Sequence, residues 1–162
     1  ADGDQSPLKE LDQNGVYRWM PGGAAVLIDG SLTRPNGVAL SPDERLLYIS
    51  VSDEKAPRIL AYPLDAHGLP RGDPRVLLDA RPLIAGGAPG LPDGMKVAAD
   101  GTLFCSGPGG MFVLSPEGEP LGLIADGQAI ANCCFGEDGR TLFMTSSDRV
   151  LRMPLRINGW RA

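Results

Sequence analysis

The sequence predicts an all-β fold, and three observations support this prediction. The first is composition: 22 Gly and 15 Pro stand in a chain with 43% hydrophobic residues, as expected for short apolar segments separated by turns. The second is a pattern that occurs three times along the chain, and the third is the Asp-Gly turns inside that pattern. The apolar content is too high for a disordered chain.

Each copy of the pattern starts with Asn or Asp, passes through small and apolar residues to an acidic turn, and ends in a second apolar run. Gly101 and Gly139 follow aspartates, as in tight hairpin turns that need a positive φ angle, and Pro42-Asp43 opens an equivalent turn. Three β-hairpins are therefore expected. They are residues 36–43 with 46–50, residues 93–101 with 103–106, and residues 132–139 with 142–145.

Two more strand-like runs follow each of the first two hairpins. They are residues 59–62 and 76–79, then residues 111–114 and 121–125. Four strands per unit, with units that start 57 and 39 residues apart, match the blade of a β-propeller better than a sandwich or a solenoid. Residues 80–91 are rich in Gly and Pro, so they are expected to form a loop that accounts for the longer spacing.

The units at both ends of the chain are incomplete. Residues 16–19 and 24–28 read as outer strands of a preceding blade, and residues 150–155 are a single strand after the third hairpin. The chain 1–162 is thus expected to be one domain with two full blades and a partial blade at each end. Such an arc exposes unpaired sheet edges, so further blades from the same protein or another chain must complete the ring.

Charge and hydropathy exclude two classes of partner. The net charge of −5 and the pI near 4.8 argue against a nucleic-acid partner, which would require a clustered basic surface. The longest apolar stretches, such as residues 24–28, are too short to span a bilayer, so no membrane partner is expected. Cytoplasmic and periplasmic locations of a soluble protein both remain open.

Few residues offer conventional hydrolytic machinery. The only histidine, His67, lies in the turn of residues 65–68 and is expected to face solvent, so no Ser-His-Asp triad is expected. Cys105 and the vicinal pair Cys133 and Cys134 lack zinc-site spacing and are expected to be buried as small hydrophobic side chains. A hydrolase built from this chain would therefore need a metal ion to activate water.

Alignment of the three hairpins places Asn36, Asp93 and Asn132 at one structural position. This position is the start of the innermost strand of successive blades, where side chains converge on the central channel. Two amides and a carboxylate are oxygen donors that suit Ca²⁺ or Mg²⁺ and can serve Zn²⁺. The alternative is that these residues stand at strand entries because their side chains bond the local backbone.

Five motifs also carry a resemblance to a known family. They are residues 34–37, 46–50, 91–95, 107–110 and 132–136. Together they resemble the gluconolactonase family, also called SMP-30/regucalcin-like or luciferin-regenerating-enzyme-like, over Pro7 to Leu155. The resemblance implies a six-bladed propeller, of which this chain supplies about three blades, with one divalent cation in its channel. It also implies lactone hydrolysis.

The resemblance assigns roles to named residues. It implies that Asn36 and Asp93 bind the metal and that Asp93 is also the general base. Asn132 matches a position near the channel without a settled ligand role, so it is a candidate for contact with the metal ligands or the substrate. The flanking Arg34 and Lys96 are candidates for orienting sugar hydroxyls, although strand alternation could point them away from the channel. The implied ion is Ca²⁺, with Zn²⁺, Mg²⁺ or Mn²⁺ as alternatives.

The chain departs from the family pattern at two places. The Glu that also holds the metal, in the first blade of the family, has no counterpart here, and Glu10 stands at the wrong place in the pattern. Residues 50–53 replace the Asp-Ser pair that follows this strand in many relatives, which puts substrate contacts there in doubt.

The expected activity is metal-dependent hydrolysis of a sugar lactone to its aldonic acid. Two alternatives remain open at this point. One is a non-catalytic propeller that binds a partner and uses the metal structurally, and the other is a related esterase with a different ester or lactone substrate.

Overall fold

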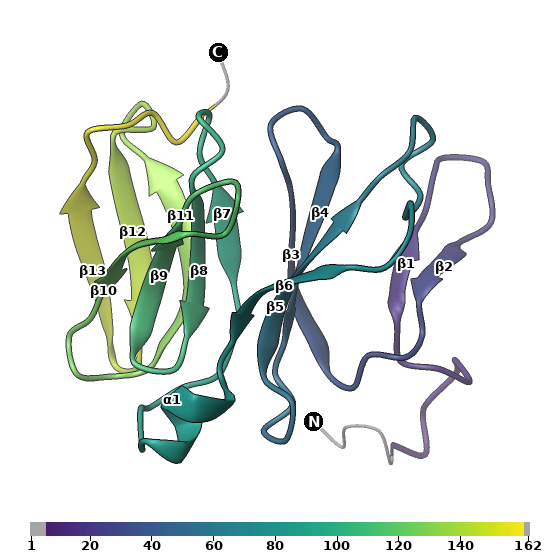
Figure 1. Cartoon of the computed structure of the whole chain (residues 1–162), viewed down its shortest axis with the longest axis horizontal. Coiled ribbons are helices and arrows are strands. Elements are labelled where there is room, and N and C mark those ends of the chain that lie inside the picture. Colours follow the sequence, from purple (N-terminus) through teal and green to yellow (C-terminus); the bar gives the residue numbers. More distant parts are fainter. Residues whose placement is uncertain (1–5, 161–162) are drawn as a thin grey trace.

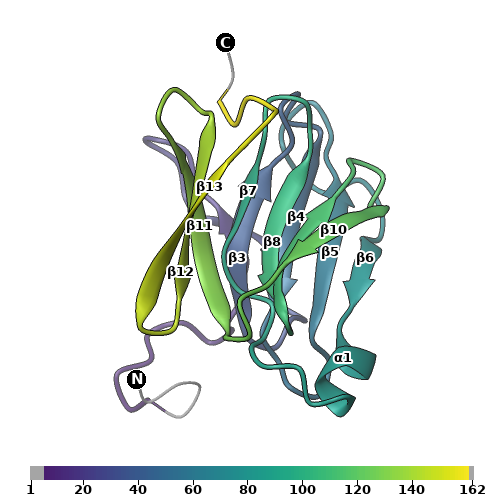
Figure 2. The same ribbon diagram turned by 90° about the vertical axis from the view of Figure 1, so that its left-hand side faces the viewer.

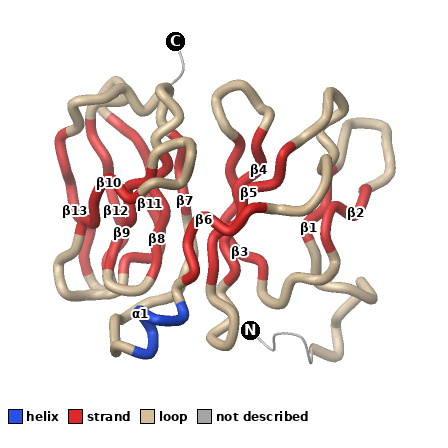
Figure 3. Tube along the Cα trace, in the orientation of Figure 1, coloured by secondary structure: helices blue, strands red, loops and turns tan. Residues whose placement is uncertain are grey.

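The computed structural model describes residues 6–160, and in this range the fold is all-β (Figures 1 and 3). The strands form four antiparallel sheets that follow one another in chain order. The first sheet pairs β1 (Val16–Arg18) with β2 (Val26–Asp29). The second contains β3 (Pro35–Leu40), β4 (Leu46–Val51), β5 (Arg58–Pro63) and β6 (Arg75–Asp79).

The third and fourth sheets repeat this arrangement. The third contains β7 (Met95–Val97), β8 (Leu103–Gly107), β9 (Gly110–Leu114) and β10 (Pro120–Ile124). The fourth contains β11 (Ile130–Gly136), β12 (Thr141–Ser146) and β13 (Arg149–Pro154). Strand order within each sheet is the chain order, so the three larger sheets are up-and-down meanders, as in a propeller blade.

The hairpin turns adopt the backbone conformations that the sequence predicts. Gly101 and Gly139 have φ angles of 89° and 74°. In the first hairpin the same left-handed conformation falls on Glu44, with φ 59°, directly after the Pro42-Asp43 pair. The Asp43 carboxylate accepts hydrogen bonds from Ser41 and from the Arg45 backbone, and these bonds hold the turn.

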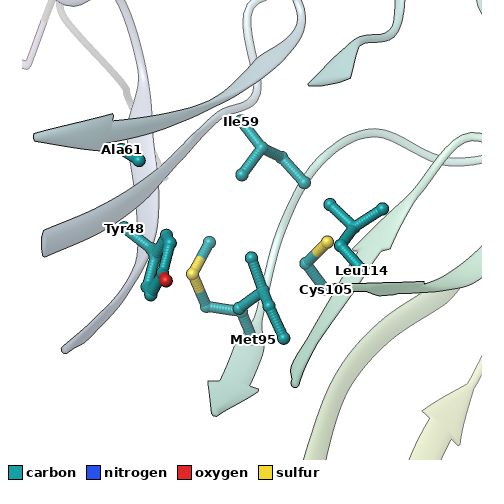
Figure 4. Packing of buried hydrophobic residues seen from close by; sticks show 7 residues of the cluster. Tyr48, Ile59, Ala61, Met95, Cys105 and Leu114 are labelled. Carbon is teal, nitrogen blue, oxygen red and sulfur yellow. The ribbon is translucent and has the colours of Figure 1, made fainter. Parts of the chain in front are cut away.

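The hydrophobic core is divided into layers between successive sheets. In β4, Leu47, Ile49 and Val51 pack toward the first sheet, whereas Tyr48 packs toward the third. Side chains alternate along a strand, so β4 can carry apolar residues on both of its faces only because both faces are buried. Figure 4 shows the layer between the second and third sheets, where Tyr48 lies against Met95.

The first strands of the three larger sheets lie next to one another. β7 contacts both β3 and β11, and Figure 2 shows the three side by side. This arrangement is consistent with a propeller-type fold. Two strand boundaries differ from the prediction: Asp93 precedes β7 by two residues, and Asn132 lies inside β11. The reason is that Gly94 N–H donates to the Ala131 carbonyl of β11 rather than to β8.

Residues 80–91 contain a short helix, which corrects the expectation of a loop. Helix α1 (Arg81–Ala85) has Pro82 in its first turn, where a missing N–H costs no hydrogen bond. The Asp79 carboxylate accepts both the Arg81 backbone N–H and its guanidinium, which fixes the start of the helix. This five-residue helix, the only one in the described part of the chain, could not reach across a bilayer.

The cysteines are all free, but only two of them are buried. Burial raises the pKa of Cys105 far above its ordinary value and that of Cys133 to about 12. Cys134 is exposed, contrary to the expectation that all three are buried. The reason is strand alternation, because Cys133 and Cys134 are consecutive residues of β11 and point to opposite faces.

A Tyr62→Phe substitution tests the contact between the first two sheets. The buried Tyr62 hydroxyl donates to Asp29 Oδ2 at 2.6 Å, from β5 to the end of β2. Its loss should cost about 1 kcal/mol at pH 7, below the roughly 1.5–3 kcal/mol of a buried bond to a charged group, because Asp29 is partly solvated. Urea unfolding measures this difference, and Tyr17→Phe is the control because the Tyr17 hydroxyl bond to the Gln13 carbonyl is exposed.

The Tyr62 effect should depend on pH with a defined sign. Burial by itself raises the pKa of Asp29, but the hydrogen bonds from Tyr62 and Ser31 outweigh it and leave this pKa lowered. A lowered carboxyl pKa stabilises the fold above the unfolded value of about 3.9, and this stabilisation is lost as the pH falls through the folded pKa. The difference between wild type and Tyr62→Phe should therefore shrink at pH 3, and an equal difference at both pH values would contradict this account.

Candidate functional site

The site residues Asn36 and Asp93 come from neighbouring sheets and are joined through Ser50. The Gly37 N–H donates to Ser50 Oγ at 2.7 Å, and the Ser50 hydroxyl donates to the Asp93 carbonyl at 2.6 Å. Ser50 is completely buried. One hydroxyl therefore connects the backbone next to Asn36 with the backbone of Asp93.

A second serine connects the same two places through the Asn36 side chain. Asn36 Nδ2 donates to Ser52 Oγ at 3.0 Å, and the Ser52 hydroxyl donates to the Pro92 carbonyl at 2.5 Å. The Asn36 side chain also lies near enough to the Asp93 carboxyl to lower its pKa. The structure thus connects Asn36 with the residues around Asp93 through Ser52.

The environment of Asp93 favours its protonated form relative to an ordinary aspartate. Partial burial raises the pKa of the Asp93 carboxyl, and the hydrogen bond from Asn36 lowers it by less, so the net pKa is raised. A carboxylate of raised pKa is a stronger base than one in free solution, which suits a group that must accept a proton.

Two glycines allow this close approach of neighbouring strands. A Cβ on Gly37 would lie 2.1 Å from the Asp93 carbonyl oxygen, and a Cβ on Gly94 would lie 2.2 Å from the Asn132 side chain. No other residue fits either position without displacement of its neighbour. The glycines that follow Asn36 and Asp93 in the sequence are therefore part of how the site is assembled.

Asn132, the third residue of the predicted site, lies in the fourth sheet. Its side chain lies against Gly94, but its Oδ1 accepts the N–H of Cys133 at 2.8 Å, which is a bond to the local backbone. Its own N–H donates to Thr145 Oγ1 at 3.1 Å. Asn36, Asp93 and Asn132 thus occupy adjacent strands or strand entries, as the alignment of the hairpins predicts.

The two flanking cations have partners away from Asn36 and Asp93. Lys96 is exposed, and its Nζ donates to the Met95 carbonyl at 3.0 Å. Arg34 is exposed with a φ angle of 53°, and its charge helps to lower the pKa of Asp53. Within residues 6–160, no hydrogen bond joins either cation to Asn36 or Asp93.

The donor atoms fit a divalent cation, although this chain supplies only part of a coordination shell. The Asn36 amide oxygen and the Asp93 carboxylate are the hard oxygen ligands that Ca²⁺ and Mg²⁺ prefer. Within residues 6–160, no group of three or more His, Cys, Asp or Glu side chains could hold a metal, so further ligands would have to be added to these two. Glu10 is exposed near the start of the chain.

An open groove of about 1030 Å³ lies elsewhere, between the first and second sheets. Its lining includes Tyr17, Val38 and Leu40 but neither Asn36 nor Asp93. The groove exists because the first sheet has only two strands and leaves part of β3 uncovered. Its lining also includes acidic side chains and His67, but no group of three or more His, Cys, Asp or Glu side chains within residues 6–160 could hold a metal there. The connection between Asn36 and Asp93 through the two serines therefore defines the candidate site.

Sequence reasoning missed the serines that join the sheets. Ser50 and Ser106 are polar residues at the ends of otherwise apolar buried strands, which is the signal that could have revealed them. Ser106 repeats the role of Ser50, because it accepts the Asp93 N–H at 3.1 Å and donates to the Ala131 carbonyl at 3.1 Å.

Comparisons with known proteins place this geometry in a family. The model of the SMP-30/gluconolactonase/LRE-like region matches residues 2–148. A gluconolactonase from Zymomonas mobilis is 46% identical over 158 residues, which are 96% of this chain and 44% of that protein. The chain therefore spans about half the length of this relative.

Solved structures agree with the sequence match. A gluconolactonase from Xanthomonas campestris superposes with a TM-score of 0.76 at 32% identity, over 90% of this chain and 46% of that one. A calcium-binding protein, regucalcin, from Agrobacterium tumefaciens shares the fold with a TM-score of 0.69 at 21% identity, over 86% of this chain and 52% of its own. On the evidence of the family model and of these matches, the chain belongs to the SMP-30/gluconolactonase/LRE-like family.

Proposed function

We propose that this chain forms part of a metal-dependent lactonase that hydrolyses a sugar lactone to the corresponding aldonic acid. The observation that carries the proposal is that Ser50 and Ser52 join Asn36 and Asp93, from two sheets, at the adjoining first strands. The names of the Zymomonas and Xanthomonas relatives support the choice of lactone.

The proposed enzyme is a complete six-bladed propeller, to which this chain contributes about three blades. Coverage of 44% and 46% of the two relatives supports this proportion. The remaining blades would come from the same protein or from another chain. They would supply further metal ligands, among them the carboxylate that residues 6–160 do not place beside Asn36 and Asp93.

Asn36 and Asp93 would hold the metal ion through their oxygen atoms. A bound divalent cation supplies Lewis acidity toward the lactone carbonyl and lowers the pKa of a water molecule. Ca²⁺ is our first choice because the donors are hard oxygens and because the regucalcin neighbour is described as calcium-binding. Mg²⁺, Mn²⁺ and Zn²⁺ are alternatives.

The chemical role of this chain lies with Asp93. Its carboxylate would accept a proton as water attacks the lactone carbonyl, and the ring oxygen would take up a proton as the ester bond opens. Asn132, Arg34 and Lys96 remain candidates for contacts with the sugar hydroxyls.

A direct assay tests the proposal on the whole natural protein. A pH indicator should report acid release from glucono-1,5-lactone above the rate of the protein-free reaction, and a chelator should abolish the excess. Added Ca²⁺ should restore it. Turnover that survives the chelator would contradict metal dependence, and no turnover on any aldonolactone would favour the binding module or another ester substrate.

A further inference from the structure

We propose that Ser52 is a positioning residue that sets the orientation of the Asn36 amide, so that Oδ1 of Asn36 is presented as the ligand atom. This inference rests on the proposed metal site and adds a residue to it. It starts from the hydrogen bonds that connect β3, the end of β4 and residues 92–93.

The orientation of an Asn amide follows here from counting hydrogens. A serine hydroxyl has one hydrogen, and that of Ser52 is donated to the Pro92 carbonyl, which can only accept. The Ser52 oxygen can therefore only accept from Asn36, so the Asn36 atom that faces it must be the NH₂ group. The reversed amide would place two acceptors 3.0 Å apart without a hydrogen between them.

The amide oxygen lies on the other side of the Asn36 side chain. With Nδ2 turned to Ser52, Oδ1 faces away from the serine. Within residues 6–160, no hydrogen bond is made to Asn36 Oδ1. This oxygen is the atom that a cation would bind.

Both the backbone and the side chain of Ser52 are held by hydrogen bonds. Its N–H donates to the Arg34 carbonyl at 3.0 Å, which ties it to the residues just before Asn36. Its hydroxyl reaches Pro92, the residue before Asp93. Ser52 therefore orients the side-chain amide of Asn36 while it is itself hydrogen-bonded to the backbone next to Asp93.

Ser50 has a different role in the same region. It connects the Gly37 N–H with the Asp93 carbonyl and touches only backbone atoms of the two strands. Loss of Ser50 would change the spacing of the strands as well as the site. Ser52 is the sharper target, because its contact with Asn36 is made to the side chain.

The experiment compares Ser52→Ala and Ser52→Thr with the wild type of the whole protein. Calorimetric titration with Ca²⁺ should show affinity about tenfold weaker for Ser52→Ala, as for other residues that orient a metal ligand. Ser52→Thr keeps a hydroxyl and should restore most of the affinity. Ser146→Ala is the matched control, since Ser146 is buried at the end of β12 and bonds the Asp126 carboxylate.

A second measurement does not depend on the metal. The Asn36 side-chain NH₂ signals in a ¹⁵N spectrum of the metal-free protein, assigned by their loss in Asn36→Ala, should shift in Ser52→Ala. They should also exchange faster with water. Ser52→Thr and Ser146→Ala should leave them close to their wild-type positions.

The outcomes separate this inference from the proposed function. Unchanged Asn36 signals in Ser52→Ala, or equal Ca²⁺ affinity in Ser52→Ala and wild type, would overturn the role of Ser52 while leaving the lactonase proposal intact. A Ca²⁺ affinity of Ser52→Thr as low as that of Ser52→Ala would also overturn the role of Ser52. A wild type that binds no Ca²⁺ would count against the metal site, and the NH₂ signals would then decide the role of Ser52 alone.

Discussion

Replacement of Asp93 by Asn should lower kcat by about 10²- to 10⁴-fold while metal binding remains measurable. An amide keeps an oxygen donor for the ion but cannot accept a proton at neutral pH. The affinity for metal should weaken because a charge is lost. The prediction separates the two roles proposed for this residue, which the structure places beside Asn36 in a partly buried position.

The matched variant is Asn36→Ala, which removes the other proposed ligand and leaves the carboxylate in place. Its defect should lie mainly in metal affinity, so excess Ca²⁺ should restore much of its rate. Steady-state kinetics of both variants at saturating metal, together with calorimetric titration, give the comparison. Near-normal turnover of Asp93→Asn at saturating metal would exclude proton abstraction by this carboxylate.

The β-hairpins were the most predictable part of the fold. The turns at Gly101 and Gly139 need positive φ angles, and the preceding aspartates made both visible in the sequence. The apolar run of residues 46–50 also indicated the second strand of the first hairpin, which is β4. These features depend on a few neighbouring residues, which explains why a single sequence was sufficient to find them.

Features that depend on contacts between sheets were not predictable in the same way. Asp93 was expected at the start of a strand, but its backbone N–H bonds Ser106 and the next residue pairs with β11, so β7 starts later. Helix α1 was missed because glycine and proline around it indicated a loop, while the Asp79 carboxylate that fixes its start lies in β6.

The candidate site likewise combines residues that the sequence predicts with contacts that it does not. Asn36 and Asp93 were predicted from the repeat and the family resemblance, and the structure connects their neighbourhoods through Ser52. Ser52 was interpreted as a departure from the family pattern that affects substrate contacts. Its bonds to Asn36 and Pro92 could not be foreseen, because they join positions 16 and 40 residues away in the chain.

Gly37→Ala should be among the most damaging single-methyl changes in the described part of the chain. The added Cβ would lie 2.1 Å from the Asp93 carbonyl oxygen and 3.0 Å from Ser50 Oγ. The carbonyl belongs to backbone that is held by its own bond to Ser50, so it cannot turn away as a flexible side chain could. We expect a loss of about 1–3 kcal/mol in the free energy of unfolding, as for other overpacked cores.

Two other glycines provide the scale for this prediction. Gly122→Ala in β10 adds its methyl to open space and should change the free energy of unfolding by less than about 0.5 kcal/mol. Gly94→Ala meets the Asn132 side chain, which can rotate at the cost of its bond to Cys133, so its effect should fall between the two. Urea unfolding of the three variants gives the order directly.

The Gly37 variant should also lose function beyond its loss of stability. Separation of Gly37 from Asp93 breaks the bridge through Ser50 and moves the Asn36 amide away from the carboxyl. At a temperature where the variant is still folded, its Ca²⁺ affinity should therefore fall, whereas that of Gly122→Ala should match the wild type. If Gly37→Ala bound Ca²⁺ as tightly as Gly122→Ala, the close approach of these two strands would not be what assembles the metal site.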